Sequence, residues 1–128
     1  MPVTYKIDAK KRIVRTKCFG QVKLQEVIDH FRALAQDPEC PQLLNVFLDL
    51  RETDSLPSAN HISVVINQVG KVRSRVQFGA CAIVASRDAL FGTMRMFEAR
   101  AEEFFVVTRA FRTAAEAEEW LATHQSGI

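Results

Sequence analysis

This sequence has little of several features that would assign a chain to a class of protein. Cysteine occurs three times, at Cys18, Cys40 and Cys81, and the odd count and wide spacing provide neither a disulfide framework nor a C-x-x-C motif. No stretch approaches the roughly 18 apolar residues of a membrane span, and "MPVTYKIDAKK" has no apolar core of a secretory leader. We therefore expect a cytoplasmic protein without a membrane span.

An excess of charge of one sign is also lacking. Seventeen Lys and Arg residues stand against 15 Asp and Glu residues, which leaves a formal net charge of +2 at pH 7. Acidic and basic residues are interleaved along most of the chain, whereas a nucleic-acid-binding surface needs a clustered basic face. We therefore expect no nucleic-acid partner.

Motifs of known catalytic chemistry are missing as well. His30, His61 and His124 do not have the spacing of zinc-binding helices, and neither a G-x-G-x-x-G motif nor a Walker-type loop occurs. His61 follows Asp54 and Ser58 closely, but neighbours in one loop rarely supply the geometry of a catalytic triad. The sequence thus predicts no enzyme activity, no metal and no cofactor.

What the sequence does contain is a regular succession of strand and helix patterns. Its 128 residues fit one domain, with a core at about residues 3–122 and a frayed tail at 123–128. Alternating apolar residues predict strands at 3–7 and 13–19, and nearly continuous apolar runs predict buried strands at 43–50, 78–85 and 104–111. Helical spacing of apolar residues predicts helices at 24–35, 58–75, 88–102 and after residue 113.

The order β-β-α-β-α-β-α-β-α predicts an α/β fold. We expect a mixed, mostly parallel sheet covered by helices, with right-handed crossovers and one antiparallel strand from the opening hairpin. Ser58 is a predicted N-cap, and Thr113 with Glu116 forms a predicted capping box. Gly79 and Ala80 indicate close approach by a helix.

Glycine inside a helix pattern is a further signal. Gly92 lies in the predicted helix 88–102, where a glycine costs up to ~1 kcal/mol relative to alanine. Such a glycine needs a reason, and the usual reasons are close packing or a ligand that approaches the backbone.

Several stretches carry a resemblance to a known family. The element order, "NVFLDLRETDSLPS", "VASRDALFGTMRMFEARAEE" and the terminal "AEAEEWL" are similar to the SpoIIAA-like group, which includes STAS domains and bacterial STAS/SEC14 domain-containing proteins. The similarity extends from Tyr5 to Leu121. It implies a single SpoIIAA-like (STAS-like) domain with a non-enzymatic binding or regulatory role.

The resemblance also implies a phosphorylation site. In STAS domains of the anti-sigma factor antagonist type, a strand ending in Asp-Leu is followed by an Asp-Ser pair, and a partner kinase phosphorylates that serine. Asp49-Leu50 and Asp54-Ser55 resemble these parts, although Leu and Pro follow the serine where the family has a small residue and glycine. The structural alternative is that Ser55 or Ser58 caps a helix and Asp49 binds backbone amides.

A ligand or partner surface is predicted where the strands 43–50 and 78–85 end side by side. It combines the junction 49–61 with the helix 88–102, and its residues are Asp49, Arg51, Asp54, Ser58, His61, Phe91 and Arg95. Arg95 lies among Phe and Met residues, a composition that is enriched in interfaces. It is either an anion clamp, an interface anchor or a solvated side chain.

Two functions remain open from the sequence. The first is a regulatory or protein-interaction domain that docks a partner protein, or a second copy of itself as a homodimer, through this surface. The second is a carrier or sensor of an apolar small molecule or lipid, which the SEC14 side of the resemblance and the nine Phe and three Met residues indicate. A carrier needs an apolar cavity of at least ~300 Å³, and an interaction domain needs an exposed apolar patch.

Overall fold

Five strands and four helices make up the computed structural model, which describes residues 2–41, 43–54, 56, 58–72, 75–102 and 105–124. The strands are β1 (Val3–Asp8), β2 (Ile13–Gly20), β3 (Leu43–Thr53), β4 (Gln77–Val84) and β5 (Phe105–Phe111), and the helices are α1 (Leu24–Gln36), α2 (Ala59–Val72), α3 (Asp88–Ala101) and α4 (Ala114–Ala122). One sheet has the order β1-β2-β3-β4-β5, with β1 antiparallel to β2 and the other pairs parallel. The predicted element order and the mixed, mostly parallel sheet are confirmed.

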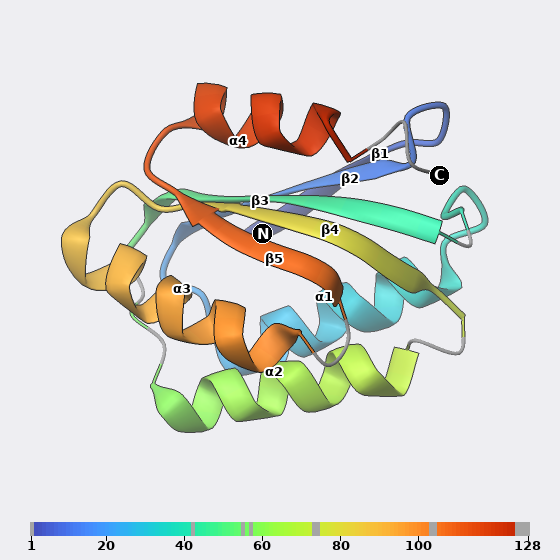
Figure 1. The fold of residues 1–128 in the computed structure, drawn as a ribbon. Coiled ribbons are helices and arrows are strands. Elements are labelled where there is room, and N and C mark those ends of the chain that lie inside the picture. The colour runs from blue at the N-terminus through green and yellow to red at the C-terminus, as the bar shows by residue number, and fades with distance from the viewer. Residues whose placement is uncertain are drawn as a thin grey trace.

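The helices cover the two faces of the sheet unequally. Helices α1, α2 and α3 lie on one face, and α4 lies on the other (Figure 1). Each of the first three helices connects a strand to the next parallel strand in the same direction, so right-handed crossovers place all three on one side. A large apolar cluster lies beneath these three helices, and a smaller one lies beneath α4, which packs against β3, β4 and β5.

The ends of the helices follow from local sequence. Ser58 Oγ accepts a hydrogen bond from the N–H of His61 at 3.2 Å, and Thr113 Oγ1 accepts one from the N–H of Glu116 at 3.3 Å. Both side chains therefore occupy the predicted capping positions. Helix α1 ends before Asp37, whose backbone is extended, because a residue that precedes proline disfavours the α conformation.

Two boundaries differ from the predictions. Strand β3 continues to Thr53 instead of ending near residue 50, because Glu52 and Thr53 pair with Phe19 and Gly20 of β2. Helix α2 ends at Val72. The stripe of α2 was predicted to include Val76, which is buried in the core although it lies outside the helix.

Gly79 serves a different purpose from the predicted approach of a helix. Asn45 of β3 faces both Gly79 and Ala80 of β4, because the register shifts at this point and forms a bulge. Asn45 Oδ1 accepts a hydrogen bond from the N–H of Ala80 at 2.8 Å, and a Cβ atom at Gly79 would collide with that oxygen. The prediction for Gly79 is therefore wrong, while Ala80 does lie in the apolar cluster beneath helix α4.

Gly92 has open space beside it. A Cβ atom at Gly92 would meet no atom of the described residues within 4 Å, once its chain neighbours and the backbone of its own helix are set aside. Close packing is therefore not the reason for this glycine. A ligand near the backbone of Gly92 stays a prediction.

The chain after α4 remains attached to that helix for two residues. Thr123 and His124 donate backbone hydrogen bonds to Trp120 and Leu121 at 3.1 Å and 3.0 Å, and the His124 ring lies 4.4 Å from the Trp120 ring. The rest of the predicted tail, residues 125–128, lies outside the described residues. In the described part of the chain, no helix has the length and apolar composition needed to cross a lipid bilayer.

Candidate functional site

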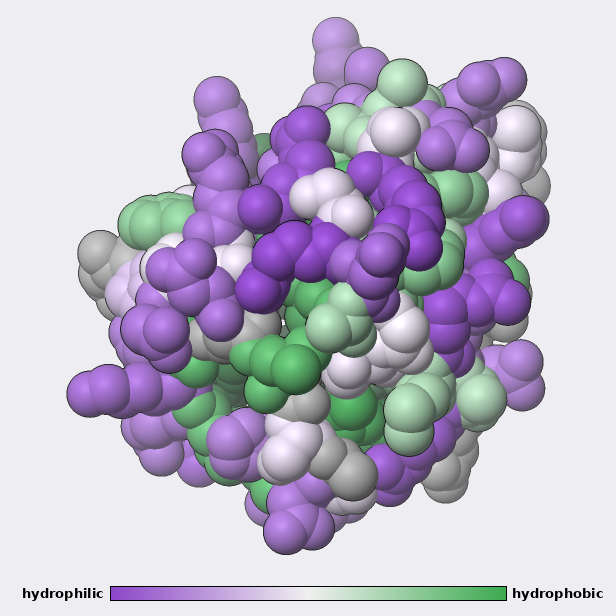
Figure 2. Space-filling view, turned by 90° about the vertical axis from the view of Figure 1, so that its left-hand side faces the viewer, coloured by the Kyte–Doolittle hydropathy of each residue, from purple (hydrophilic) through white to green (hydrophobic). Residues whose placement is uncertain are grey.

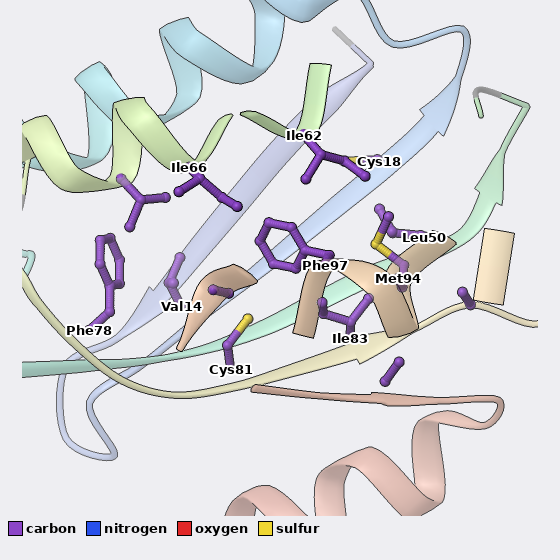
Figure 3. Packing of buried hydrophobic residues seen from close by; sticks show 14 of the residues in the cluster. Val14, Cys18, Leu50, Ile62, Ile66, Phe78, Cys81, Ile83, Met94 and Phe97 are labelled. Carbon is purple, nitrogen blue, oxygen red and sulfur yellow. The ribbon is translucent and has the colours of Figure 1, made fainter. Parts of the chain in front are cut away.

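A cavity of about 370 Å³ lies between the sheet and helices α1, α2 and α3. Cys18 and Leu50 point toward this space from strands β2 and β3, and Ile62 and Phe97 point toward it from helices α2 and α3 (Figure 3). The lining is mostly aliphatic and aromatic. Its volume lies in the usual range of small-molecule sites, ~300–1,000 Å³.

Short side chains on the sheet leave this space open. The residues of β2 that face the helices are Val14, Thr16 and Cys18, which follow the period of two along a strand. On the neighbouring strand β3, Val46 and Leu48 lie beneath the helices and are nevertheless only half-buried. Because protein interiors are otherwise close-packed, partial exposure in the middle of the sheet marks the cavity.

The opening of the cavity is formed by its exposed lining residues. These are Gln21 after β2, Asp54 and Leu56 after β3, and His61 in the first turn of α2. Leu56 is 56% exposed, which is unusual for a large apolar residue. Figure 2 looks at the side where the parallel strands end, and hydrophobic residues are visible there in the middle, bordered by hydrophilic ones.

One pair of polar side chains lies on the wall of the cavity. Thr16 Oγ1 is 3.3 Å from His30 Nε2, and Thr16 is 2% exposed. The Nδ1 atom of His30 is buried and has no hydrogen-bond partner among the described residues. The His30 ring is held by the rings of Tyr5 and Phe31, each with its centroid 5.3 Å away. Burial lowers the pKa of His30 to about 4, so this imidazole is neutral at pH 7.

The cysteine thiols on the cavity wall are unreactive at neutral pH. Cys18 and Cys81 carry free thiols, and burial raises the pKa of each to about 12. Because the thiolate is the nucleophile and the metal ligand, protonated thiols at neutral pH are poor in both roles. Among the described residues, no group of three or more His, Cys, Asp and Glu side chains is arranged to hold a metal ion.

Charge is nearly absent from the cavity. Of the described residues that line it, Asp54 is the one carboxylate, and no Lys or Arg is among them. Asp54 is exposed at the opening. A bound molecule would therefore meet apolar and neutral polar groups inside and a negative charge at the entrance.

The surface predicted from the sequence is divided between the two faces of the sheet. Asp49 and Arg51 form a bidentate ion pair, with Arg51 Nη2 2.8 Å from Asp49 Oδ2 and Arg51 Nε 3.0 Å from Asp49 Oδ1. Because strand side chains alternate, Asp49 and Arg51 share the α4 face of β3 with Phe47. The hydrogen bond from Arg51 lowers the pKa of Asp49 below its usual range. Asp49 Oδ1 also accepts a hydrogen bond from the backbone N–H of Arg51 at 3.0 Å. Asp49 therefore binds a backbone amide, as the structural alternative to the phosphorylation site predicted.

Other predicted residues lie on the cavity side. Asp54 and His61 line the opening, and Ser58 caps helix α2 beside them. The N–H of Asp54 donates to the carbonyl oxygen of Gly20 at 2.8 Å, which joins the ends of β2 and β3 at the opening. The proposed phosphosite Ser55 lies outside the described residues.

Phe91 and Arg95, the remaining predicted residues, lie on helix α3. Phe91 is half-buried against the core, and the guanidinium carbon of Arg112 lies 4.3 Å from the centroid of its ring. Arg95 is exposed, and its Nη1 lies 3.6 Å from Glu98 Oε2. Neither residue lines the cavity.

Sequence reasoning missed Thr16 and His30. A signal for both was present, because Thr16 lies between Val14 and Cys18 on the buried side of an alternating strand. His30 precedes Phe31 in an amphipathic helix and lies one turn after Val27. That these two side chains meet depends on the packing of α1 against β2, which no local pattern encodes.

A comparison with solved structures identifies the fold. This chain is similar to an uncharacterized protein of the DUF3478 family with a SpoIIAA-like fold, from Shewanella loihica PV-4, with a TM-score of 0.60 and 15% sequence identity over 93% of this chain and 91% of that chain. This chain has a SpoIIAA-like fold. The fold that the sequence predicted is thereby confirmed. No family model and no curated protein matches the sequence, and at 15% identity the shared SpoIIAA-like fold carries no function with it.

Proposed function

We propose that this protein is a non-enzymatic carrier or sensor that binds an apolar small molecule in the cavity between the sheet and helices α1 to α3. The observation that carries the proposal is the apolar cavity of about 370 Å³ with exposed residues at its opening. The cavity opens to solvent, so its apolar walls are in contact with water in the unoccupied protein, and an apolar occupant removes that contact.

Binding in such a site is driven by the removal of apolar surface from water. Each buried methylene group contributes about 0.8 kcal/mol, and the aliphatic and aromatic lining provides the complementary surface. The junction between β3 and α2 forms the entrance, because Asp54, Leu56 and His61 border it. An occupant in contact with these residues would alter the surface of the junction, which is how a sensor would report its presence.

Filling the cavity from the protein side tests the proposal. Val46 lines the cavity from β3, and a Val46→Phe substitution adds an aromatic ring where the occupant would lie. We expect the neutral fluorescent probe N-phenylnaphthylamine to bind the native protein saturably and to bind this variant at least tenfold more weakly.

The matched control is Val107→Phe. Val107 lies on β5 in the cluster under α4, on the opposite face of the sheet, so the same added bulk should leave probe binding unchanged. Circular dichroism checks that both variants fold. A native protein that does not bind the probe, or equal binding by both variants, contradicts the proposal.

The regulatory or interaction role is a second candidate, favoured by two exposed apolar side chains. Leu56 at the junction is 56% exposed, and Met96 of helix α3 is 61% exposed. Exposed apolar residues of this size occur at interfaces, and a second copy of the chain is the simplest partner. Regulation through Ser55 belongs to this candidate and stays a prediction.

Sedimentation velocity separates this candidate from the first. A homodimer that uses these residues should dissociate in Leu56→Asp and Met96→Asp variants and persist in Met96→Leu, which keeps an apolar side chain. A native protein that sediments as a monomer at all accessible concentrations would remove the homodimer.

A further inference from the structure

We infer that the occupant of the cavity is an uncharged molecule with an apolar body and one hydroxyl or carbonyl group, which is bound by the Thr16–His30 pair. The inference rests on the proposed function and names the class of ligand. It draws on three observations: the size of the cavity, the charges of its lining, and a polar pair on an otherwise apolar wall.

The size of the cavity limits the size of the molecule. A dry cavity of ~150 Å³ holds benzene, which corresponds to about 25 Å³ for each non-hydrogen atom. At that density, the volume of about 370 Å³ takes a molecule of about 15 non-hydrogen atoms. A medium-length alcohol, ketone or terpenoid has this size, whereas a two-chain phospholipid does not fit.

The lining disfavours a charged group. A carboxylate or phosphate buried in the cavity would find no Lys or Arg among the described lining residues, and at the opening it would meet the carboxylate of Asp54. His30 supplies no positive charge, because burial keeps its imidazole neutral. Since an unpaired charge is costly to bury, a fatty-acid anion is the wrong ligand for this site.

The Thr16–His30 pair can bind a neutral polar group in either tautomer of the histidine. If Nε2 accepts from the hydroxyl of Thr16, then Nδ1–H is a free donor and the Thr16 oxygen is a free acceptor. If Nε2–H donates to Thr16, then the hydroxyl proton is a free donor and Nδ1 is a free acceptor. In either tautomer Thr16 Oγ1 keeps one hydrogen-bonding position, as an acceptor in the first case and as a donor in the second, and a ligand hydroxyl group can match both.

The Nδ1 atom of His30 points away from Thr16 and is buried without a hydrogen-bond partner among the described residues. A molecule in the cavity does not reach it, so the polar contact is assigned to Thr16 Oγ1, which the His30 ring holds in place. Asn45 Nδ2 and Thr108 Oγ1 are also buried without a described partner, but neither residue lines the cavity.

The experiment compares decanol, decanoate, decylamine and decane, which share an alkyl chain and differ in the head group. Each compound is titrated against N-phenylnaphthylamine bound to the native protein, and the displacement of the probe is measured. The titration is done at pH 8, where decanoate is an anion and decylamine is a cation. We expect decanol to displace the probe at a concentration at least tenfold lower than decanoate or decylamine, and more effectively than decane. Equal or stronger displacement by either charged compound overturns the inference.

Variants of Thr16 test the place of the hydroxyl group. Thr16→Val removes one hydroxyl from the cavity wall and should lower decanol affinity about three- to tenfold while leaving decane unchanged, as expected for one neutral hydrogen bond. Thr16→Ser keeps the hydroxyl and should retain the preference for decanol. The matched control is Thr108→Val, the same change at a buried threonine outside the cavity lining, and it should have no effect.

The outcomes separate this inference from the function on which it rests. If the native protein binds the probe but Thr16→Val prefers decanol over the other compounds as strongly as the native protein does, the assignment of the polar site is overturned. The proposed carrier role is not contradicted by that result. A native protein that binds neither the probe nor any of the four compounds overturns the proposed function, and the inference with it.

Discussion

At the residue scale, Asn45 and Gly79 act as one unit in the middle of the sheet. The buried Asn45 side chain closes the bulge by accepting from the N–H of Ala80 at 2.8 Å, and Gly79 leaves the space that Asn45 Oδ1 occupies. A polar group buried in this way needs its partner, because an unsatisfied donor or acceptor costs about 1–3 kcal/mol. The two residues are therefore coupled across neighbouring strands.

We predict opposite effects of alanine at two glycines. Gly79→Ala should lower the free energy of unfolding by about 1–3 kcal/mol, because the added Cβ collides with Asn45. Gly92→Ala should raise it by about 0.5–1 kcal/mol, because Gly92 lies in a helix interior with open space beside it. Urea unfolding measures both changes. If Gly79→Ala costs as much in an Asn45→Ala background as in the native protein, the proposed coupling is wrong.

His30 makes stability depend on pH. Its pKa is lowered from 6.5 to about 4 in the folded protein, so the folded state binds its proton later than the unfolded state as pH falls. The contribution of neutral His30 to the free energy of unfolding is present in full above pH 6.5 and is lost as the pH falls toward 4. At about 1.4 kcal/mol per pKa unit, the loss is up to about 3 kcal/mol.

The measurement compares unfolding at pH 7 and pH 4.5 for the native protein and for His30→Phe, which keeps a ring between Tyr5 and Phe31. The variant should lose less stability than the native protein over this interval. Carboxylates such as Asp49 also lose stabilisation on acidification, but they do so in both proteins and cancel in the difference. Equal losses in the native protein and in His30→Phe would refute the role of His30.

At the element scale, local sequence patterns predicted the presence of helices and strands better than they predicted where those elements end. The period of two in β1 and β2 and the caps at Ser58 and Thr113 were readable from the residues alone. The extension of β3 to Thr53 could not be predicted from local sequence, because it depends on pairing with Phe19 and Gly20 more than thirty residues earlier. A long-range partner decided where that strand ends.

The cap of helix α4 gives a prediction at this scale. Thr113→Ala should lower the free energy of unfolding by about 1 kcal/mol, because the N–H of Glu116 loses its hydrogen bond to the threonine oxygen. Thr93→Ala removes a threonine from inside helix α3, where its hydroxyl bonds to the carbonyl of Ala89, and should have little or a slightly stabilising effect. Chemical unfolding of the two variants makes the comparison, and equal costs would refute the capping role.

At the scale of the whole molecule, the fold could be predicted and the cavity could not. Element order and the family resemblance were sufficient for the SpoIIAA-like fold. The cavity depends on how far α1, α2 and α3 stand from Val46 and Leu48, which is set by the sum of many contacts. The predicted ligand or partner surface depends on three-dimensional packing in the same way, and in the structure its residues are divided between two faces of the sheet. Asp49 and Asp54 are close in sequence but lie on opposite faces.

Occupancy of the cavity should stabilise the whole molecule. A ligand that binds the folded state alone adds about 2.7 kcal/mol at a concentration one hundred times its Kd. For a domain of this size, decanol at that concentration should raise the Tm on the order of 10 °C. Differential scanning calorimetry measures the shift, which should disappear in Val46→Phe and persist in Val107→Phe. A Tm that does not change with decanol would count against an occupant of this kind.

The placement of α4 alone on the far face of the sheet has a practical consequence. Helices α1, α2 and α3 enclose the cavity, so the α4 side can be altered without touching the entrance (Figure 1). Glu119 is exposed on that helix and offers a position for a dye or for attachment to a sensor chip. A protein held there would present its opening to the surrounding solution, which is the orientation that a biosensor for small neutral molecules requires.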